Sequence, residues 1–370
     1  MKIVYVLRDI TDYGGIQQVT CLLINSLLHE RKNYTISTVS LYNKYAVPAF
    51  KLNDDVTNYT LFEKEVDTKK QFINIKCRLK KILRNLNPDI IVVQGIAFTN
   101  YLSHSIFQNS RVVACEHGHY HMSGKYGLHW FGIKRALKYA DAVVTLTDLD
   151  ARNYREQSSS KTIIKRIYNP CIYSSDFINT DHSDSKIIVS CGTLDSIKRF
   201  DHAVNAAQKV FSKHPDWKWY IYGDGETHSK LQDLINQKNL KEHVILKGNE
   251  KNKNLIYGDK AFLVVTSNFE GFGMVLFEAM QYCLPVVSYN VDYGPKEIIE
   301  DGVNGFLVAD GNVDALSSAI IKLIENKKDY LEMCSKSGQS LQKFKDSEIV
   351  QQWIDLFETI LKNGDGYESL

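Results

Sequence analysis

The sequence lacks several features that would assign it to a broad class of protein. No apolar run approaches the roughly 20 residues of a membrane-spanning helix, and the N-terminus lacks the basic, apolar and small-residue layout of a signal peptide. None of the 7 cysteines forms a C-x-x-C pair, which favours reduced thiols over a disulfide framework. Internal repeats and low-complexity tracts are absent too. We therefore expect a cytoplasmic protein, either soluble or peripheral at the inner face of the plasma membrane.

A surplus of one charge is also missing, since 45 Lys and Arg face 43 Asp and Glu and the formal net charge is +2. This balance predicts no nucleic-acid partner and no acidic partner. At 370 residues the chain is long for one domain and sufficient for two. Its hydrophobic content of 44% and charged content of 24% are typical of a soluble globular enzyme.

Strand-like apolar runs alternate with helical patterns along the whole chain, which predicts an α/β fold with parallel sheets. Each half begins with a strand that leads into a glycine-containing turn, as in two Rossmann-like domains. The strands predicted in the first half are Ile3–Leu7, Thr35–Leu41, Ile90–Gln94, Val112–Cys115 and Ala142–Leu146. Those in the second half are Lys186–Cys191, Lys218–Tyr222, Val244–Lys247, Phe262–Thr266, Pro285–Tyr289 and Gly305–Val308.

The predicted boundary between the two domains is the segment Tyr168–Asp184, which is rich in Ser and Asp and has little helical periodicity. We expect an N-terminal domain of residues 1–170 and a C-terminal domain of residues 171–346. Residues 347–370 should form a final amphipathic helix, because Ile349, Trp353 and Phe357 recur at helical spacing.

The most informative stretch is Glu270-Gly-Phe-Gly-Met-Val-Leu-Phe-Glu278, which follows a predicted strand and suits a buried helix. Unpaired N–H groups and the helix dipole at such a junction attract an anion, most plausibly a diphosphate. Gly271 and Gly273 permit a close approach of the backbone to a ligand. Glu270 should lie just before the helix and Glu278 about a turn and a half inside it.

This stretch resembles the signature of the retaining glycosyltransferases of family 4, which have the GT-B fold. The resemblance covers nearly the whole chain and depends on several ordered motifs. They are Tyr13-Gly-Gly15, Cys115-Glu-His117, Tyr168-Asn-Pro170, Cys191-Gly-Thr-Leu-Asp-Ser-Ile-Lys-Arg199, Tyr222-Gly-Asp-Gly225, Leu284-Pro-Val-Val287 and Gly294-Pro-Lys-Glu297. The motifs of the second half look most like those of bacterial polysaccharide-building members.

The resemblance implies two Rossmann-like domains that face each other across a cleft, with the last helix crossing back onto the N-terminal domain. It also implies a reaction: transfer of a sugar from a nucleotide-sugar, with a UDP-sugar as the expected donor, to a hydroxyl of a glycan or lipid-linked glycan. The sugar would keep its anomeric configuration, and neither a metal nor another cofactor would take part. The acceptor would bind the N-terminal domain and the donor the C-terminal domain.

By the same resemblance, His117 contacts a sugar hydroxyl, Lys198 neutralises the donor diphosphate, Glu270 lies by the donor sugar and Glu278 holds the ribose. The family usually has an arginine where this sequence has Thr193, and we expect Arg199 to compensate. The full set of expected donor-binding positions is Gly14, Gly15, Gly192, Arg199, Gly223, Gly271, Phe272, Gly273, Met274, Val275 and Glu278.

Several of these residues also have simpler interpretations. Gly14-Gly15 suits an ordinary strand-to-helix turn, and it is not the G-x-G-x-x-G fingerprint of a nicotinamide site. The alternation of His117, His119 and His121 also fits a metal site. Asp148-Leu-Asp150 follows Thr147 at a strand-to-helix junction, where capping of the helix is favoured over a metal–nucleotide site. Two carboxylates such as Glu270 and Glu278 also occur in sugar hydrolases.

Two further questions stay open at the level of sequence. The stretch Lys69–Arg84 has seven cations, no acid and apolar residues at helical spacing, which fits either an anionic membrane surface or the solvated face of a core helix. The chain could also be a non-catalytic partner of another transferase, or a nucleotide-sugar epimerase or phosphorylase on a similar frame.

Overall fold

The computed structural model describes residues 1–122, 124, 126–158, 161–171, 182 and 184–365. The chain divides into two compact units, which we describe separately. Unit 1 combines Met1–Pro170 with Phe344–Leu370, and unit 2 comprises Cys171–Lys343. Within the described residues, no helix combines the length and the apolar character that crossing a membrane requires.

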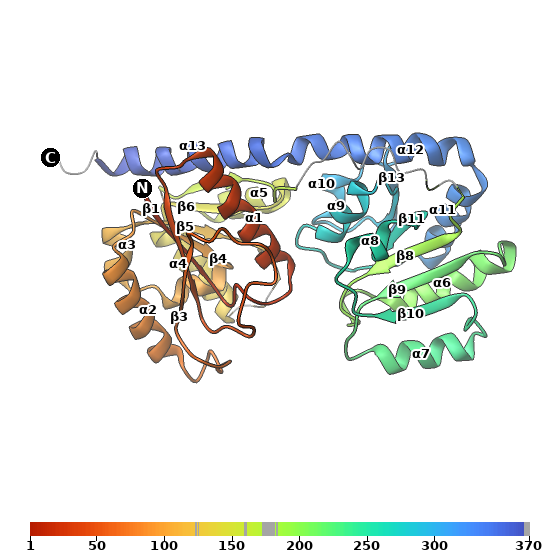
Figure 1. The fold of residues 1–370 in the computed structure, drawn as a ribbon, viewed down its shortest axis with the longest axis horizontal. Coiled ribbons are helices and arrows are strands. Elements are labelled where there is room, and N and C mark those ends of the chain that lie inside the picture. The colour runs from red at the N-terminus through yellow and green to blue at the C-terminus, as the bar shows by residue number, and fades with distance from the viewer. Residues whose placement is uncertain (123, 125, 159–160, 172–181, 183, 366–370) are drawn as a thin grey trace. The chain divides into compact units, whose positions relative to one another are not determined.

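Unit 1 contains a parallel sheet with the strand order β3-β2-β1-β4-β5-β6-β7 (Figure 1). Its strands are β1 (Lys2–Leu7), β2 (Thr35–Ser40), β3 (Thr57–Thr60), β4 (Ile90–Gln94), β5 (Arg111–Cys115), β6 (Ala142–Thr145) and β7 (Ile163–Arg166). Its helices are α1 (Gly15–Glu30), α2 (Phe72–Leu86), η1 (Ile96–Tyr101), α3 (His104–Asn109), α4 (Leu128–Tyr139), α5 (Asp148–Gln157) and α13 (Asp346–Asp365).

The strands of unit 1 are buried on both faces, which explains their nearly continuous apolar runs. Successive residues of β1 point to opposite faces: Ile3 and Tyr5 pack with α1 and α13, whereas Val4 and Val6 pack with α2 and α4. Unit 1 is therefore a three-layer α/β/α structure.

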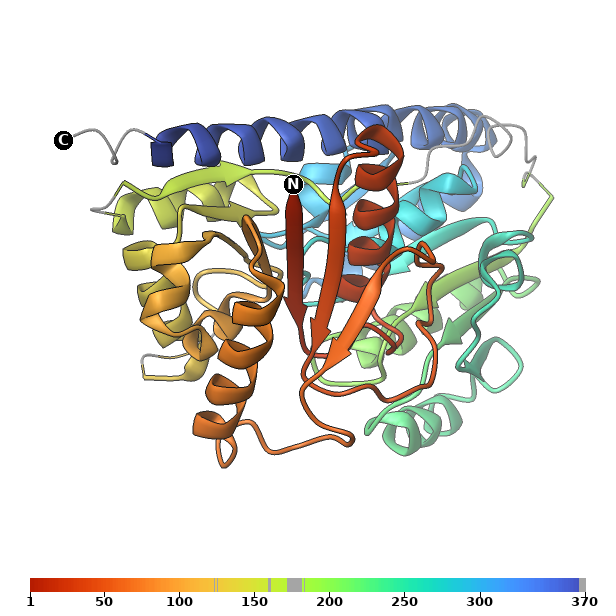
Figure 2. The ribbon, with the colours of Figure 1, turned by 60° about the vertical axis from the view of Figure 1, so that its left-hand side comes forward.

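The last helix, α13, completes one of these two layers. Its buried residues include Ile349, Trp353 and Phe357, which share a core with the strands of unit 1. α13 lies beside α1 in both views (Figures 1 and 2), and Ser26 of α1 donates a hydrogen bond to Asp346 at 3.3 Å. The predicted return of the C-terminal helix to the N-terminal domain is confirmed.

Unit 2 contains a second parallel sheet, with the strand order β10-β9-β8-β11-β12-β13. Its strands are β8 (Ile187–Cys191), β9 (Lys218–Tyr222), β10 (Val244–Gly248), β11 (Phe262–Val265), β12 (Val286–Tyr289) and β13 (Gly305–Val308). Its helices are α6 (Phe200–Lys213), α7 (His228–Gln237), α8 (Lys253–Tyr257), α9 (Met274–Gln281), α10 (Pro295–Ile298), α11 (Val313–Glu325), α12 (Lys327–Gln339) and η3 (Ser340–Phe344), which runs to the boundary with unit 1.

The main core of unit 2 lies between the sheet and helices α6, α7 and α11. Trp219 of β9 and Phe262 of β11 are fully buried there, with Ile320 of α11. The predicted fold class, two parallel Rossmann-like α/β domains, is thus confirmed. All eleven predicted strands are present, and the sequence analysis missed two, β3 and β7, which are the edge strands of the first sheet.

Candidate active site

In each sheet there is one point at which the order of strand addition reverses, so that the next strand is added on the opposite side of the first one. In unit 1 the chain builds β1, β2 and β3 toward one edge and then places β4 on the other side of β1. In unit 2 it builds β8, β9 and β10 and then places β11 on the other side of β8. Ligands of open α/β sheets bind outside the carboxyl ends of the strands at such a switch point. The segments that follow β1, β4, β8 and β11 are therefore where function is expected.

In unit 2, an ion pair joins the segments that follow β8 and β11. Lys198 Nζ lies 2.7 Å from Glu270 Oε1, and Ser267 Oγ donates to the same oxygen at 2.7 Å. The backbone of Lys198 is fixed too, because its N–H donates to Asp195 Oδ1 at 3.0 Å and its carbonyl accepts from Thr266 Oγ1 at 2.7 Å. Two predicted catalytic residues are thus brought together at the switch point.

Arg199 has a different environment from the one we expected. Its guanidinium donates to the carbonyls of Thr266 and Ser267, each at 3.0 Å, and it forms an ion pair with Asp310. It also lies 4.9 Å from the ring centre of Tyr289. These contacts commit Arg199 to holding the loop that leads to Glu270. The expected role of Arg199 in donor binding, in place of the arginine that the family usually has at position 193, stays a prediction.

Glycines allow two loops to pass closely at the same edge of the sheet. Gly223, after β9, has φ +136°, and a Cβ on it would lie 1.9 Å from the carbonyl oxygen of Gly192, after β8. A Cβ on Gly192 would meet the Lys198 side chain at 3.3 Å. Only glycine fits position 223, because both the backbone angle and the space exclude a side chain.

Helix α9 begins directly after the loop that carries Glu270. Its N-cap is Gly273, with φ +88°, and the backbone N–H groups of its first turn, which begins with Met274 and Val275, point out of the start of the helix. Phe272 is buried and lies 5.1 Å from the ring of Phe277. Its side chain therefore belongs to the core, and only its backbone can meet a ligand.

Glu278 lies in the second turn of α9 and is 6% exposed. Tyr257 donates a hydrogen bond to its Oε2 at 2.9 Å, and Lys253 Nζ lies 2.7 Å from its Oε1. Sequence analysis missed both partners. They are four residues apart on the five-residue helix α8, and that spacing alone carries no chemical signal.

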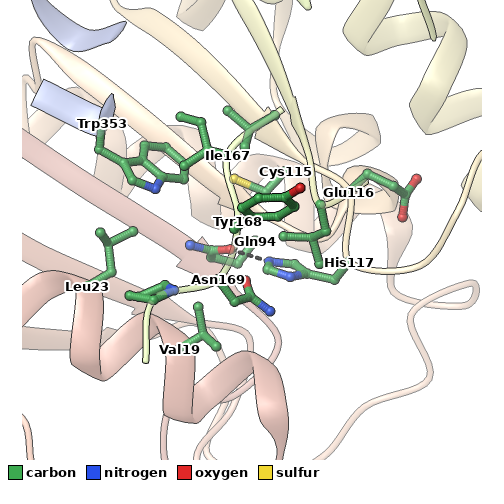
Figure 3. A pocket seen from close by; sticks show the side chains of 13 residues that line it. Val19, Leu23, Gln94, Cys115, Glu116, His117, Ile167, Tyr168, Asn169 and Trp353 are labelled. Carbon is green, nitrogen blue, oxygen red and sulfur yellow. Dashed lines mark hydrogen bonds between the residues drawn. The ribbon is translucent and has the colours of Figure 1, made fainter. Parts of the chain in front are cut away.

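In unit 1, His117 follows β5 and lies in a small pocket with Gln94, the last residue of β4 (Figure 3). The imidazole Nε2 and Gln94 Oε1 form a hydrogen bond. Trp353 of α13 and Tyr168 line the same pocket. Burial lowers the pKa of His117 to about 4, so its imidazole is neutral near pH 7. Gln94 was also missed, although a polar residue at the end of a buried apolar strand was a usable signal.

The residue before His117 anchors this strand end from another side. Glu116 is buried and accepts hydrogen bonds from Gly118 N at 2.8 Å, His129 Nε2 at 2.8 Å and Tyr154 OH at 2.7 Å. Burial opposes its ionisation, but the bonds from His129 and Tyr154 and the charge of His129 prevail, so the pKa of Glu116 is lowered. Glu116 thereby fixes the backbone on both sides of His117.

The structure bears on two alternatives from the sequence analysis, the helix-capping role of the Asp-x-Asp segment and the metal site suggested by the histidines. Thr147 Oγ1 accepts from Asp150 N at 3.2 Å, which confirms the helix-capping interpretation. His121 contacts the ring of Tyr120 at 5.0 Å, whereas His129 bonds Glu116. Among the described residues, no group of three His, Cys, Asp or Glu is placed to hold a metal ion.

An open pocket of about 410 Å³ lies at the switch point of unit 1. Such a volume falls within the range of small-molecule sites, about 300–1,000 Å³. Arg8 follows β1 and pairs with Glu65 at 2.6 Å, and Lys44 pairs with Asp12 at 3.3 Å. Phe98 adds an aromatic side chain. We had not singled out these residues from the sequence. They offer hydrogen-bonding groups to a ligand, and each of the two cations is paired with a carboxylate.

The glycine pair predicted near this pocket lies at the start of α1. Gly14 is the N-cap, with an extended φ of −174°, and Gly15 is the first helical residue. A Cβ on Gly14 would approach the Gln17 side chain to 2.6 Å. Because only the flexible end of Gln17 would have to move, neither space nor backbone angle requires glycine at position 14, and a role in donor binding stays a prediction.

Comparison with known proteins identifies the family of this chain. A model described as Glycosyltransferase Family 4 matches residues 14–171, and one described as Glycosyl transferases group 1 matches residues 174–341. The chain belongs to the glycosyltransferases. It is 26% identical over 360 residues to an uncharacterized glycosyltransferase of Haemophilus influenzae, which covers 95% of this chain and 98% of that protein.

Another relative, matched over a shorter stretch, has a named activity. Poly(ribitol-phosphate) alpha-N-acetylglucosaminyltransferase of Staphylococcus aureus is 32% identical over 175 residues, which are 47% of this chain and 36% of that protein. Among solved structures, the pneumococcal O-GlcNAc transferase GtfA, in complex with UDP and GlcNAc, gives a TM-score of 0.78 at 16% identity. It covers 98% of this chain and 99% of that one, and at this identity it shows a shared GT-B fold.

Proposed function

We propose that this glycosyltransferase uses a UDP-sugar bound by unit 2 and transfers its sugar, with retention, to a hydroxyl of a glycan or lipid-linked glycan during surface polysaccharide synthesis. The observation that carries the proposal is the Lys198–Glu270 pair at the switch point of unit 2, directly before the start of α9. UDP in the pneumococcal GtfA structure supports the choice of base.

Lys198 and the first N–H groups of α9 would hold the donor diphosphate. As the bond from the sugar to the diphosphate breaks, negative charge grows on the leaving oxygen, and a fixed ammonium stabilises that charge more in the transition state than in the ground state. Lys198 would thus supply the charge that a metal supplies in other transferases, so we propose a metal-independent reaction. Glu278 would accept hydrogen bonds from the ribose hydroxyls.

In the transfer step, the bond from the anomeric carbon to the diphosphate oxygen breaks, and the acceptor oxygen forms a new bond on the same face of the sugar. The acceptor proton passes to the leaving diphosphate, so the products are UDP and a glycoside. Glu270 would stabilise the positively charged sugar, and His117, as a neutral imidazole, would bond a sugar hydroxyl. The S. aureus relative is named for an α-linkage, and an α-linkage made from an α-linked nucleotide-sugar is retention.

The test is a donor screen that measures nucleoside diphosphate released from UDP-, GDP- and ADP-sugars, with and without EDTA. We expect release from a UDP-sugar that persists in EDTA and is lost in Glu270→Ala. Glu332→Ala is the matched control, because Glu332 is an exposed acid of unit 2 on α12. Loss of activity in EDTA would contradict metal independence, and a preferred GDP- or ADP-sugar would contradict the donor.

The same screen separates the non-catalytic alternative. If no donor is cleaved and titration calorimetry detects no UDP binding, the proposal is wrong and the non-catalytic alternative is favoured. An anomeric proton signal of inverted configuration in the product, measured by NMR, would contradict retention alone.

A further inference from the structure

Two helices of unit 1, α2 and α4, carry cations but no acid. In a chain with nearly equal numbers of cations and acids, eight cations without an acid form a local surplus of positive charge. Within the described residues, none of the eight forms an ion pair with a carboxylate. They are Lys76, Arg78, Lys80, Lys81 and Arg84 on α2, and Lys134, Arg135 and Lys138 on α4.

The apolar stripe of α2 is not available to a partner. Ile75, Leu79 and Leu83 are each 1% exposed and pack in the core of unit 1. The helix therefore cannot lay this stripe on a membrane while unit 1 stays folded. What α2 presents outward is its basic side, and any docking surface must be built from that side and its neighbours.

Those neighbours belong to α4. The two helices border an open groove of about 430 Å³ whose lining includes Phe72 and Lys76 from α2, and Phe131, Lys134 and Lys138 from α4. Among the described residues, every charged side chain that lines the groove is a cation. Such a surface complements an anionic partner.

Exposed apolar side chains accompany these lysines. Ile73 is 74% exposed, Tyr126 79% and Phe131 46%. The ring of Trp130 lies 5.8 Å from that of Tyr126 and 5.0 Å from that of Phe131, and Lys134 Nζ lies 5.8 Å from the Trp130 ring centre. Aromatic rings mixed with lysines are typical of surfaces that enter the headgroup layer of a membrane.

We propose that this surface docks unit 1 on an anionic phospholipid membrane. We call it the α2–α4 face and define it by Ile73, Lys76, Tyr126, Phe131, Lys134 and Lys138. A soluble polyanion would satisfy the lysines and leave the apolar side chains in water. A lipid surface takes both, since phosphates meet the lysines while the rings enter the layer beneath them.

The test uses the full chain and sedimentation with vesicles of phosphatidylcholine alone or of phosphatidylcholine mixed with phosphatidylglycerol. We expect binding to the mixed vesicles only, weakened by added salt because the attraction is screened. The triple variant Lys76→Gln, Lys134→Gln and Lys138→Gln should bind about 100-fold more weakly, at about fivefold per lysine.

A cluster of lysines in unit 2 provides a matched control. Lys209, Lys213 and Lys322 also line an open groove, between α6 and α11, and their triple replacement by Gln removes the same charge. This control should bind the vesicles as the unchanged protein does. The double variant Tyr126→Ser and Phe131→Ser should weaken binding about tenfold, including at high salt, because it removes the part of the attraction that salt does not screen.

Three results would overturn the proposal. They are equal binding to both kinds of vesicle, equal losses in the two lysine variants, and retention on a heparin column without vesicle binding. The proposal does not depend on the transfer reaction, because UDP binding by unit 2 is measured separately. If the unchanged protein binds UDP but not the vesicles, only the proposed docking surface is overturned, and the proposed function is unaffected.

Discussion

Unit 1 and unit 2 share the topology of their sheets but differ in the charge state of their predicted catalytic groups, although the open pocket of unit 1 also holds the ion pairs Arg8–Glu65 and Lys44–Asp12. In unit 2, each of the two glutamates is paired with a lysine: Glu270 with Lys198 and Glu278 with Lys253. In unit 1, His117 is neutral and bonds the uncharged Gln94. The comparison teaches that the fold fixes where a ligand binds, while the few residues after each strand select its chemistry. Permanent charges suit a diphosphate, and neutral groups suit sugar hydroxyls.

The strongest way to break this comparison is to remove the central charge of unit 2. Lys198→Met should lower sugar transfer by about 10²–10³-fold, because a fixed group that stabilises developing charge is lost. The readout is the rate of UDP release at saturating donor. Lys186→Met is the control, since Lys186 forms an exposed ion pair with Asp216 in the same unit, and it should leave the rate unchanged. A similar rate in Lys198→Met would show that charge at this position is not what distinguishes unit 2.

The second pair of unit 2 should matter for affinity more than for rate. Glu278→Gln should weaken UDP binding by about 10- to 100-fold, because a hydrogen bond to a charged group contributes about 1.5–3 kcal/mol. Titration calorimetry with UDP gives the affinity. Tyr257→Phe removes only a hydrogen bond that positions Glu278, so its loss should be smaller. A larger loss in Tyr257→Phe than in Glu278→Gln would contradict the assignment of Glu278 as the ribose ligand.

In unit 1, the neutral state of His117 is open to a test by pH. Because burial lowers its pKa from 6.5 to about 4, the folded protein resists protonation, and stability falls as pH drops from 6.5 toward 4. Thermal unfolding should show a smaller fall in His117→Gln, with His29→Gln as the exposed control. The rate of sugar transfer should show no inflection near pH 6.5. An inflection there that disappears in His117→Gln would mean that the imidazole is charged during turnover.

The last prediction concerns the polar core behind His117. Burial raises the pKa of Asp150 from 3.8 to about 7, so the folded protein keeps this proton, and stability is lost as pH rises from about 4 through 7. Asp150→Asn should flatten that loss, because the amide oxygen can still accept from Tyr120 N as the carboxyl does at 2.8 Å. The difference between the melting temperatures at about pH 5 and pH 8 measures this loss of stability. Asp148→Asn is the control, because Asp148 is exposed. An unchanged difference between the two pH values would contradict the raised pKa.

The sequence was sufficient to predict the strands that are buried on both faces, because burial requires continuous apolar runs such as Ile90–Gln94. It was not sufficient for the edge strands β3 and β7. Thr57–Thr60 is polar, and the side chains of Ile163–Arg166 are only half-buried. An edge strand pairs on one side only, so its sequence need not carry the full apolar signal.

The residues of the candidate site also fall into those that the sequence predicted and those that it did not. Glu270 and Glu278 could be proposed because they flank a glycine-containing turn after a predicted strand, and Lys198 because its motif resembles that of the family. Their partners could not, because the bonds of Lys253 and Tyr257 to Glu278 depend on how α8 packs against α9. The contacts of Arg199 could not be predicted either: adjacency to Lys198 suggested a shared role, which stays a prediction, whereas the bonds of its guanidinium to the carbonyls of residues 266 and 267 depend on how the loop after β11 packs.

The position of α13 has a consequence for how the chain folds during synthesis. Unit 2 is one continuous segment, so its sequence is complete at residue 343, before α13 is made. Unit 1 starts first but needs Ile349, Trp353 and Phe357 to cover one face of its sheet. Domains usually fold in the order of synthesis, but here the first unit to start is the last to finish. Until α13 is available, the part of that face that α1 does not cover remains an exposed apolar surface that a chaperone can bind.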